Sequence, residues 1–369
     1  MSHSDFVHLN CHTQYSLLDS TCRIDKLMQR ALELKFPALA MTDNGNMFAA
    51  IDFYSQAMKK GIKPIIGVAA YVAPGSRFEK QTHGIKDASF HLTLLAKDET
   101  GYRNLMKLSS IGYLEGFYYR PRMDKEVLKQ YSGGLIALSG SIKGEIPYYT
   151  RNEQPHEAKR AIREYLDIFG AENFYFEIMD HGLEPQKRII AEYKKWSKEF
   201  GVKLVATNEC RYIHRQDVRA HDALICIGTG STLDEPNRLR YQGDHYYLKS
   251  AEEMKALFKD TPEAIKTTIE IAERCNVEID FKKTHLPYFT PPQGKKQDEY
   301  LQEMCEIGLK TRFENEAPTE EYRQRMKREL ELIHKMGYTS YFLVVWDFIR
   351  YAREHGIPVG HGQGRKFQL

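Results

Sequence analysis

The chain has 369 residues, of which 42% are hydrophobic and 28% charged, and its 53 basic side chains outnumber its 50 acidic ones by only three. This composition excludes a disordered, collagen-like or low-complexity protein, and the length allows about two domains. No apolar run approaches the roughly 18 residues that a membrane helix needs, and the N-terminus has no signal peptide. We expect a cytoplasmic protein that contacts no membrane. The net charge is too small to argue for nucleic acid by itself.

Six cysteines are spread along the chain, and none of them belongs to a C-x-x-C pair. The short, cysteine-dense chain of a disulfide framework is absent. We therefore predict reduced, mostly buried thiols in a reducing compartment. A thiol is expected to bind a metal only where other ligands converge on it.

Short apolar runs alternate with helix-period segments over the first 210 residues. We predict strands over 6–10, 38–43, 62–72, 90–96, 134–139, 174–179 and 203–207. Amphipathic helices are predicted between most of them, over 24–34, 47–60, 101–114, 156–169 and 185–200. This alternation is typical of βα units and predicts an α/β fold with a parallel sheet. Seven strands are many for a small open sheet and favour a barrel.

The rest of the chain is predicted to be mainly helical. Helices are expected over 217–227, 252–257 and 262–274. Three prolines within residues 286–292 then end any helical period, so we place a domain boundary there. Further helices follow over 298–314, 320–336 and 341–354. We therefore expect one domain over residues 1–285, followed by a linker and a smaller helical segment over 286–369.

Polar side chains gather near the ends of the predicted strands, where a parallel α/β sheet carries its chemistry. Several strands contribute them: Asn10, His12, Asp19, Asp43, Asn44, His91, Ser141, Glu209 and Arg211. Zn²⁺ and Mn²⁺ bind the residue types found at five of these positions, which are His12, Asp19, Asp43, His91 and Glu209. A residue of this kind, taken alone, is more often a hydrogen-bonded structural group than a metal ligand. Their common place in the βα pattern raises the case for a joint metal site that activates water and stabilises a phosphoryl oxyanion.

Six ordered motifs lie at 8–19, 38–47, 61–67, 91–96, 134–140 and 205–209. They resemble the PHP (polymerase and histidinol phosphatase) domain of the C-family replicative polymerases, the bacterial DNA polymerase III alpha subunits. Residues 336–345 resemble the start of the palm of the same polymerases, so the similarity is collinear over nearly the whole chain. The resemblance implies a distorted (βα)₇ PHP barrel followed by a truncated start of the palm. Family members with an intact site hold up to three divalent metals, and they hydrolyse phosphoesters or remove 3′ nucleotides.

The chain departs from that family pattern at five positions. Neutral groups replace ligands at Asn10, Asn44, Ala69 and Ser141, while Arg211 stands where a histidine is normal. An arginine brings a fixed positive charge into a cluster that must accept a metal ion. We therefore predict a degenerate site with at most one weakly held Zn²⁺ or Mn²⁺, in which Arg211 pairs with Asp19, Asp43 or Glu209.

The C-terminal part carries three further signals. Gly360, Gly362 and Gly364 keep the spacing of a glycine-rich loop of the family without its other residues. Cations on the helix over 320–336 are interpreted as a solvated face, with a phosphate-facing surface as the alternative. The aromatic helix over 341–354 is expected to be core more than a stacking platform, with an exposed apolar patch where the palm is cut. The palm carboxylates of the family lie downstream, so Mg²⁺ is expected only in a complete polymerase.

Two functions remain open at this stage. The first is the N-terminal portion of a polymerase III alpha subunit, with the PHP domain as scaffold and as docking platform for a proofreading exonuclease. Its partners are then the rest of the polymerase, the exonuclease, and DNA through the full assembly. The second is a metal-dependent phosphoesterase or 3′–5′ exonuclease of the PHP family. The five departures favour the first function, and whether this chain is itself an enzyme stays open.

Overall fold

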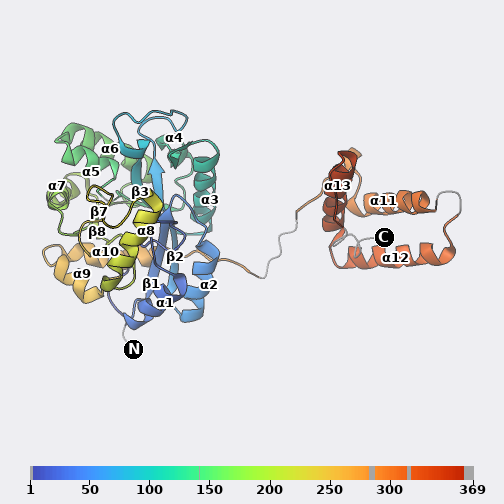
Figure 1. Cartoon of the computed structure of the whole chain (residues 1–369), viewed down its shortest axis with the longest axis horizontal. Helices are drawn as coiled ribbons and strands as arrows, with labels where there is room; N and C mark the ends of the chain where they lie inside the picture. Colours follow the sequence, from blue (N-terminus) through green and yellow to red (C-terminus); the bar gives the residue numbers. More distant parts are fainter. Residues whose placement is uncertain (1–2, 141, 282–286, 314–316, 361–369) are drawn as a thin grey trace. The chain divides into compact units, whose positions relative to one another are not determined.

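The computed structural model describes residues 3–140, 142–281, 287–313 and 317–360. The chain divides into two compact units, Met1–Ile279 and Asp280–Leu369. Figure 1 shows the first unit as a sheet surrounded by helices and the second as helices only. The predicted boundary between residues 285 and 286 lies outside the described residues, so its position stays a prediction.

An eight-stranded sheet forms the centre of the first unit. Its strands are β1 (Ala38–Asn44), β2 (Lys63–Val72), β3 (Phe90–Ala96), β4 (Phe117–Tyr118), β5 (Arg120–Met123), β6 (Leu135–Leu138), β7 (Phe174–Ile178) and β8 (Leu204–Ala206). β1 pairs with β2, from which the order continues through β3, β6 and β7 to β8, while β5 pairs with the end of β2 and with β4. The predicted α/β class is confirmed, although the short strands β4 and β5 were not predicted.

The prediction of a regular strand over 6–10 is wrong, but this extended segment joins the two edges of the sheet. On one side, the N–H of Ala40 in β1 donates to the carbonyl of His8 at 3.0 Å. On the other side, the N–H of His12 donates to the carbonyl of Cys210, beyond β8, at 2.9 Å. Because these bonds link β1 to the chain that follows β8, the sheet curls into a distorted barrel.

The prediction of an all-parallel sheet is wrong at β3. This strand pairs antiparallel with both β2 and β6, whereas the pairs β1–β2, β6–β7 and β7–β8 are parallel. The chain passes from β2 to β3 with only a single 3₁₀ turn, η1 (Lys86–Ala88), between them. Antiparallel neighbours need no crossover helix, which explains the reversal. The start of β3 therefore lies at the edge where the parallel strands end.

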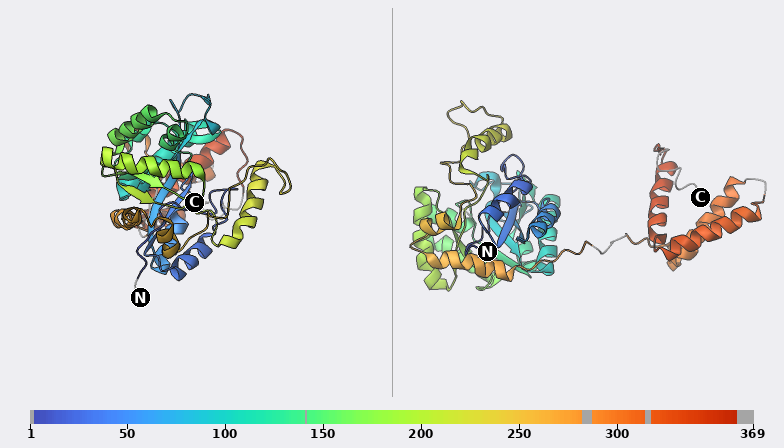
Figure 2. Two further views of the ribbon diagram at one scale, coloured as in Figure 1. Left: turned by 90° about the vertical axis from the view of Figure 1, so that its left-hand side faces the viewer. Right: turned by 90° about the horizontal axis from the view of Figure 1, so that it is seen from below.

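Helices cover the outside of the barrel (Figure 1). They are α1 (Ile24–Glu33), α2 (Ala50–Lys60), α3 (Glu99–Leu114), α4 (Lys125–Gln130), α5 (Glu145–Arg151), α6 (Pro155–Phe169), α7 (Glu184–Phe200), α8 (Val218–Thr229), α9 (Ala251–Leu257) and α10 (Pro262–Arg274), with the 3₁₀ turn η2 (Arg215–Asp217) before α8. The short helices α4 and α5 were not predicted, because six or seven residues carry little periodicity. Figure 2 shows α8 and the segment after it projecting from the barrel.

The barrel interior is apolar at the end away from the predicted site. Val7, Ala40, Ile65, Leu138 and Val205 are buried there against one another. Residues of α10 join the same cluster, so this helix covers that end of the barrel. Such burial is the main stabilising contribution to the fold.

The second unit is a small helical body made of α11 (Gln297–Arg312), α12 (Glu320–Lys335) and α13 (Thr339–Glu354), preceded by the 3₁₀ turn η3 (Pro292–Gly294). Its core centres on Leu301, Ile333 and Leu343, one from each helix. The expectation that the aromatic helix is core is wrong for part of α13, because Phe348 and Tyr351 are 54% and 56% exposed. Three helices have too little inner surface to bury so many aromatic rings.

Two further sequence expectations concern cysteines and membranes. All six cysteines lie within the described residues as free thiols, and five of them are buried. Among the helices that the structure describes, none has the length and apolar character needed to cross a membrane.

Candidate functional site

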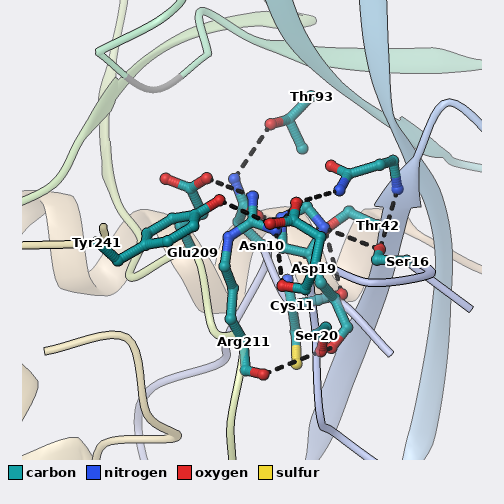
Figure 3. Close-up of polar contacts among 12 residues, drawn as sticks. Asn10, Cys11, Ser16, Asp19, Ser20, Thr42, Thr93, Glu209, Arg211 and Tyr241 are labelled. Atoms are coloured by element: carbon teal, nitrogen blue, oxygen red, sulfur yellow. Dashed lines mark hydrogen bonds and ion pairs between the residues drawn. The ribbon is translucent and has the colours of Figure 1, made fainter. Parts of the chain in front are cut away.

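Predicted site residues from three places meet at one end of the barrel. His12 and Asp19 follow the segment that joins the sheet edges, His91 is the second residue of β3, and Glu209 and Arg211 follow β8. His91 lies at this end because β3 is antiparallel. Figure 3 shows Asp19, Glu209 and Arg211 pointing toward one another.

Arg211 holds two carboxylates at once. Its Nη1 donates to Asp19 Oδ2 at 2.5 Å and its Nη2 to Glu209 Oε1 at 2.6 Å (Figure 3). The side chain of Arg211 is only 1% exposed. We call these three residues the ion-pair centre. Glu209 has a left-handed backbone with φ of 47°, a costly conformation for a residue with a Cβ, and this turn places Glu209 and Arg211 on the same side.

Burial and nearby cations compete at the two carboxylates. Burial by itself raises the pKa of Glu209, but the charges of Arg211 and Lys143 outweigh it and lower that pKa well below its usual range. The pKa of Asp19 is likewise lowered, because the charge of Arg211 overcomes the effect of burial. Both carboxylates are therefore ionised at neutral pH, and the cations that balance them belong to the chain itself.

Asp19 has two further donors. Asn44 Nδ2 donates to Asp19 Oδ2 at 2.6 Å, and the hydroxyl of Tyr241 donates to Asp19 Oδ1 at 3.0 Å. The guanidinium carbon of Arg211 lies 5.1 Å from the centre of the Tyr241 ring, within cation–π range. Both oxygens of Asp19 are thus occupied by donors of the protein.

His12 and His91 are neutral imidazoles beside this centre. Burial, together with the charge of Arg211, lowers the pKa of His12 well below its ordinary value. Burial and the charge of Lys143 lower the pKa of His91 to about 3. A neutral imidazole can bind a metal ion, but nearby positive charge disfavours one.

Asp43 is not part of the ion-pair centre. It accepts the backbone N–H and the hydroxyl of Thr13, both at 2.7 Å, and the hydroxyl of Ser16 at 2.6 Å. Ser16 Oγ in turn lies 3.2 Å from Nδ1 of His12. Asp43 therefore shapes the loop that carries His12 and Asp19, and Ser16 links it to His12.

A second buried polar cluster lies within the barrel and centres on Glu177 of β7. Glu177 accepts hydrogen bonds from Asn10 Nδ2 at 2.9 Å, Thr93 Oγ1 at 3.2 Å and Thr207 Oγ1 at 2.8 Å. Thr42 Oγ1 donates to Asn10 Oδ1 at 3.3 Å. We call these five residues the Glu177 layer. Burial raises the pKa of Glu177 to about 7, against the hydrogen bonds that lower it.

The chain is similar to known protein families in two separate regions. Residues 8–181 match the model of the PHP domain, and residues 299–366 match that of the bacterial DNA polymerase III alpha NTPase domain. The chain is 43% identical over 365 residues to the DNA polymerase III subunit alpha of Treponema pallidum, covering 99% of this chain and 31% of the relative. It is 44% identical over 363 residues to that of Borreliella burgdorferi, covering 98% of this chain and 31% of the relative.

The chain carries a PHP domain and belongs with the DNA polymerase III alpha subunits. It spans about a third of the length of these curated relatives. A solved structure of a two-domain protein from Bacteroides vulgatus, containing a predicted PHP-like metal-dependent phosphoesterase, is similar at 11% identity and a TM-score of 0.36. That alignment covers 73% of this chain and 66% of the other, and a likeness this weak says nothing about the site.

The residues of this PHP domain do not fit a multinuclear metal centre. Within the described ranges, no three His, Cys, Asp or Glu side chains are grouped so that they could hold a metal ion. Arg211 lies where a cation would have to sit between Asp19 and Glu209. A divalent ion about 4 Å from a guanidinium is repelled by about 8 kcal/mol at an effective dielectric constant of 20.

The positions predicted to be degenerate have separate places in the PHP domain. Asn10 belongs to the Glu177 layer, Asn44 supports Asp19, and Ala69 is buried in β2 beside Asn44 and Thr93. Gly360 is exposed in the second unit. Two groups of predicted positions, Ser141 and the pair Gly362 and Gly364, lie outside the described residues.

Three residues in or beside the site were not predicted from the sequence. Glu177 was detectable in principle, since it is a lone carboxylate within a predicted apolar strand. Lys143 is close enough to Glu209, Arg211 and Asp19 for their charges to act on it, but it precedes a glycine in an ordinary turn. Tyr241 lies 222 residues from Asp19 in a polar connecting segment, and no local pattern predicts their contact.

Proposed function

We propose that this chain is part of a replicative polymerase of the DNA polymerase III alpha type, in which its PHP domain is a scaffold with little or no phosphoesterase activity. The PHP domain is assigned to residues 1–285 and the start of the palm to 286–369. The relatives' common name and the 97–99% coverage of this chain by them support this proposal. The complete protein is then the species that binds DNA and uses Mg²⁺, in the cytoplasm.

The observation that carries the scaffold role is the bidentate position of Arg211 between Asp19 and Glu209. A buried guanidinium that satisfies two carboxylates stabilises the folded barrel from within. The same arrangement uses the oxygens that a catalytic metal ion needs. We therefore assign His12, Asp19, Asp43, His91 and Glu209 to a former metal site that retains at most one weakly held Zn²⁺ or Mn²⁺.

Metal content and nuclease activity test this proposal. The purified chain should contain fewer than one tightly bound divalent ion per molecule by elemental analysis. With Zn²⁺ or Mn²⁺ added, the wild type, His12→Ala and Asp19→Ala should all show the same background hydrolysis of a 3′-labelled single strand. Two or more tight ions, or activity that both substitutions abolish, would contradict the scaffold role.

One observation favours a second function, a metal-dependent phosphoesterase or 3′–5′ exonuclease. His12 and His91 are both neutral, so their ring nitrogens keep lone pairs that can bind a metal. Loss of Mn²⁺-dependent activity in both His12→Ala and His91→Ala, with folding intact, would establish this function in place of the first.

The docking role is supported by an exposed aromatic face on the PHP domain. Phe48, Tyr113 and Phe117 lie in a row with ring centres 6.4 and 6.2 Å apart, and Leu114 beside them is 85% exposed. Exposed aromatic groups of this kind are typical of protein–protein contacts. We propose that a proofreading exonuclease subunit binds here.

Binding of the purified exonuclease subunit to the chain tests this docking surface. Tyr113→Ser with Phe117→Ser should weaken the dissociation constant at least about tenfold, because aromatic anchors dominate such interfaces. Leu32→Ser, at a 42% exposed apolar position of α1, is the matched control and should leave binding unchanged. Equal loss in the control and the double variant would point to a general folding defect and reject this surface.

A further inference from the structure

The segment between α8 and α9 crosses from the surface to the ion-pair centre. We call residues 230–245 the strap. Residues 232–237 of the strap are exposed, and Figure 2 shows this part standing away from the barrel together with α8. Near its other end, Tyr241 turns inward to the site (Figure 3).

Tyr241 fastens the strap to the centre by two contacts and to α8 by a third. Its hydroxyl donates to Asp19 Oδ1 at 3.0 Å, and its ring lies over the guanidinium of Arg211 at 5.1 Å. The same ring meets His221 of α8 edge-on at 5.1 Å, and His221 Nε2 lies 3.1 Å from the carbonyl oxygen of Asp19. Asp19 is thus held from both ends of the α8–strap excursion.

A second tether lies outside the site. Both Nη atoms of Arg238 donate to the carboxylate of Asp222 in α8, each at 2.5 Å. This pair ties the strap to α8. The strap therefore has one fastening on α8 and one on the ion-pair centre. Its C-terminal end is held separately, because Asp244 pairs with Arg215 and the carbonyl of His245 accepts from Asn208 Nδ2 at 3.0 Å.

We propose that the strap is a gate to the former metal site, with Tyr241 as its latch on Asp19. Asp19 Oδ2 is occupied by Arg211 and Asn44, so Oδ1 is the oxygen through which a new cation or hydrogen-bond donor would enter. Tyr241 donates to that oxygen, in a side chain that is 27% exposed. A ligand that binds Asp19 Oδ1 competes with Tyr241 for it and so loosens the strap, which couples the site to an exposed surface segment. This inference deepens the proposed function, since it concerns access to the same centre.

Hydrogen–deuterium exchange of the full chain tests the latch. In Tyr241→Phe, amides of peptides that span residues 236–245 should exchange about ten- to hundred-fold faster, because the hydrogen bond from the strap to the Asp19 carboxylate is removed. Trypsin should cleave after Arg240, which is exposed beside the latch, with a similar increase in rate. The matched control is Tyr247→Phe, because Tyr247 also donates to a carboxylate, Glu253, but outside the strap. It should change neither rate.

A double-mutant cycle makes the test specific to Asp19. Asp19→Asn should itself speed exchange in the strap, and adding Tyr241→Phe to it should increase the rate by less than threefold, because the contact is already weakened. Asp222→Asn should speed exchange independently, so its effect should multiply with that of Tyr241→Phe. Thermal unfolding of each variant confirms that the barrel stays folded.

The proposal is overturned if Tyr241→Phe exchanges like the wild type, or if its effect multiplies in full with that of Asp19→Asn. Metal content, measured separately, reports on the proposed scaffold function. If the chain binds two metal ions tightly while the exchange results hold, the scaffold role fails and the latch stands. If the chain binds fewer than one metal ion tightly and the exchange results fail, the latch is rejected and the scaffold role stands.

Discussion

Two buried glutamates of the barrel, Glu209 and Glu177, are stabilised in opposite ways. Glu209 lies 2.6 Å from the guanidinium of Arg211, and its pKa falls well below the ordinary value. Glu177 is surrounded by one amide and two hydroxyls, and its pKa rises to about 7. Burial raises the pKa of both carboxyls, and only the charge of a cation overrides it.

This difference shows two ways in which the PHP barrel balances a buried carboxyl with groups of its own. In the ion-pair centre, a fixed cation of the chain balances two carboxylates. In the Glu177 layer, neutral donors hold a carboxyl that gains a proton easily. Neither solution needs an external ion, and each has a distinct response to substitution and to pH.

Arg211→Met should give the largest effect. It leaves Asp19 and Glu209 buried without their cation, and breaking a buried pair in this way costs about 3–5 kcal/mol. Urea denaturation at pH 7 measures the free energy of unfolding. The control is Arg325→Met, which breaks an exposed i,i+4 pair with Glu329 and should cost less than about 0.5 kcal/mol. A cost for Arg211→Met as small as that of the control would mean that the two carboxylates are neutralised by something else.

Glu177→Gln should change how the free energy of unfolding depends on pH, which tests the difference between Glu177 and Glu209. The unfolded glutamate titrates near 4.5 and the folded one near 7, so Glu177 contributes stability that is fully present below pH 4.5 and is lost as pH rises through 7. The loss amounts to about 3 kcal/mol. Denaturation at pH 4.5, 6 and 8 should show this decline in the wild type and a flatter profile in Glu177→Gln.

Glu209→Gln provides the opposite case for that experiment. Because the folded pKa of Glu209 is lowered, its stabilisation is present above the ordinary pKa near 4.5 and is lost as pH falls below it. This variant should therefore lose part of the acid-induced decline and keep the decline toward pH 8. If both variants flatten the same pH range, the two clusters are not distinct.

Thr93→Val should have an intermediate effect. The hydroxyl of Thr93 donates to Glu177 Oε2 at 3.2 Å and accepts from Asn10 Nδ2 at 3.3 Å. Losing one buried hydroxyl from this network should cost about 1–2 kcal/mol in urea denaturation. Thr311→Val, at an exposed position of α11, is the control and should cost close to nothing. A neutral Thr93→Val would show that the Glu177 layer contributes little to stability.

Phe348→Ser is expected to have the smallest effect and extends the comparison to the second unit. The side chain is 54% exposed, so its removal should change the free energy of unfolding by less than about 0.5 kcal/mol. Chemical denaturation followed by circular dichroism measures this change. A loss above about 1.5 kcal/mol would mean that the ring is buried in solution.

Much of the fold could be predicted because the relevant signals are local. β1, β2, β3, β6, β7 and β8 and most helices lie where apolar periodicity places them. The prediction that Arg211 pairs with a carboxylate also agrees with its bonds to Asp19 and Glu209, since a buried guanidinium in a carboxylate-rich site has few other partners. The choice of Asp43 as a third possible partner could not be decided locally, because Thr13 and Ser16 saturate it.

By itself, then, the sequence determined the strands, the helices and the residue types that gather at one end of the barrel, because periodicity and strand ends are properties of neighbouring residues. Only the tertiary structure decided which way β3 runs, and this direction is what brings His91 to the site from the start of its strand. It also decided that Tyr241 donates a hydrogen bond to Asp19 from 222 residues away. Contacts of this kind depend on how the chain closes on itself, and no short stretch of sequence contains that information.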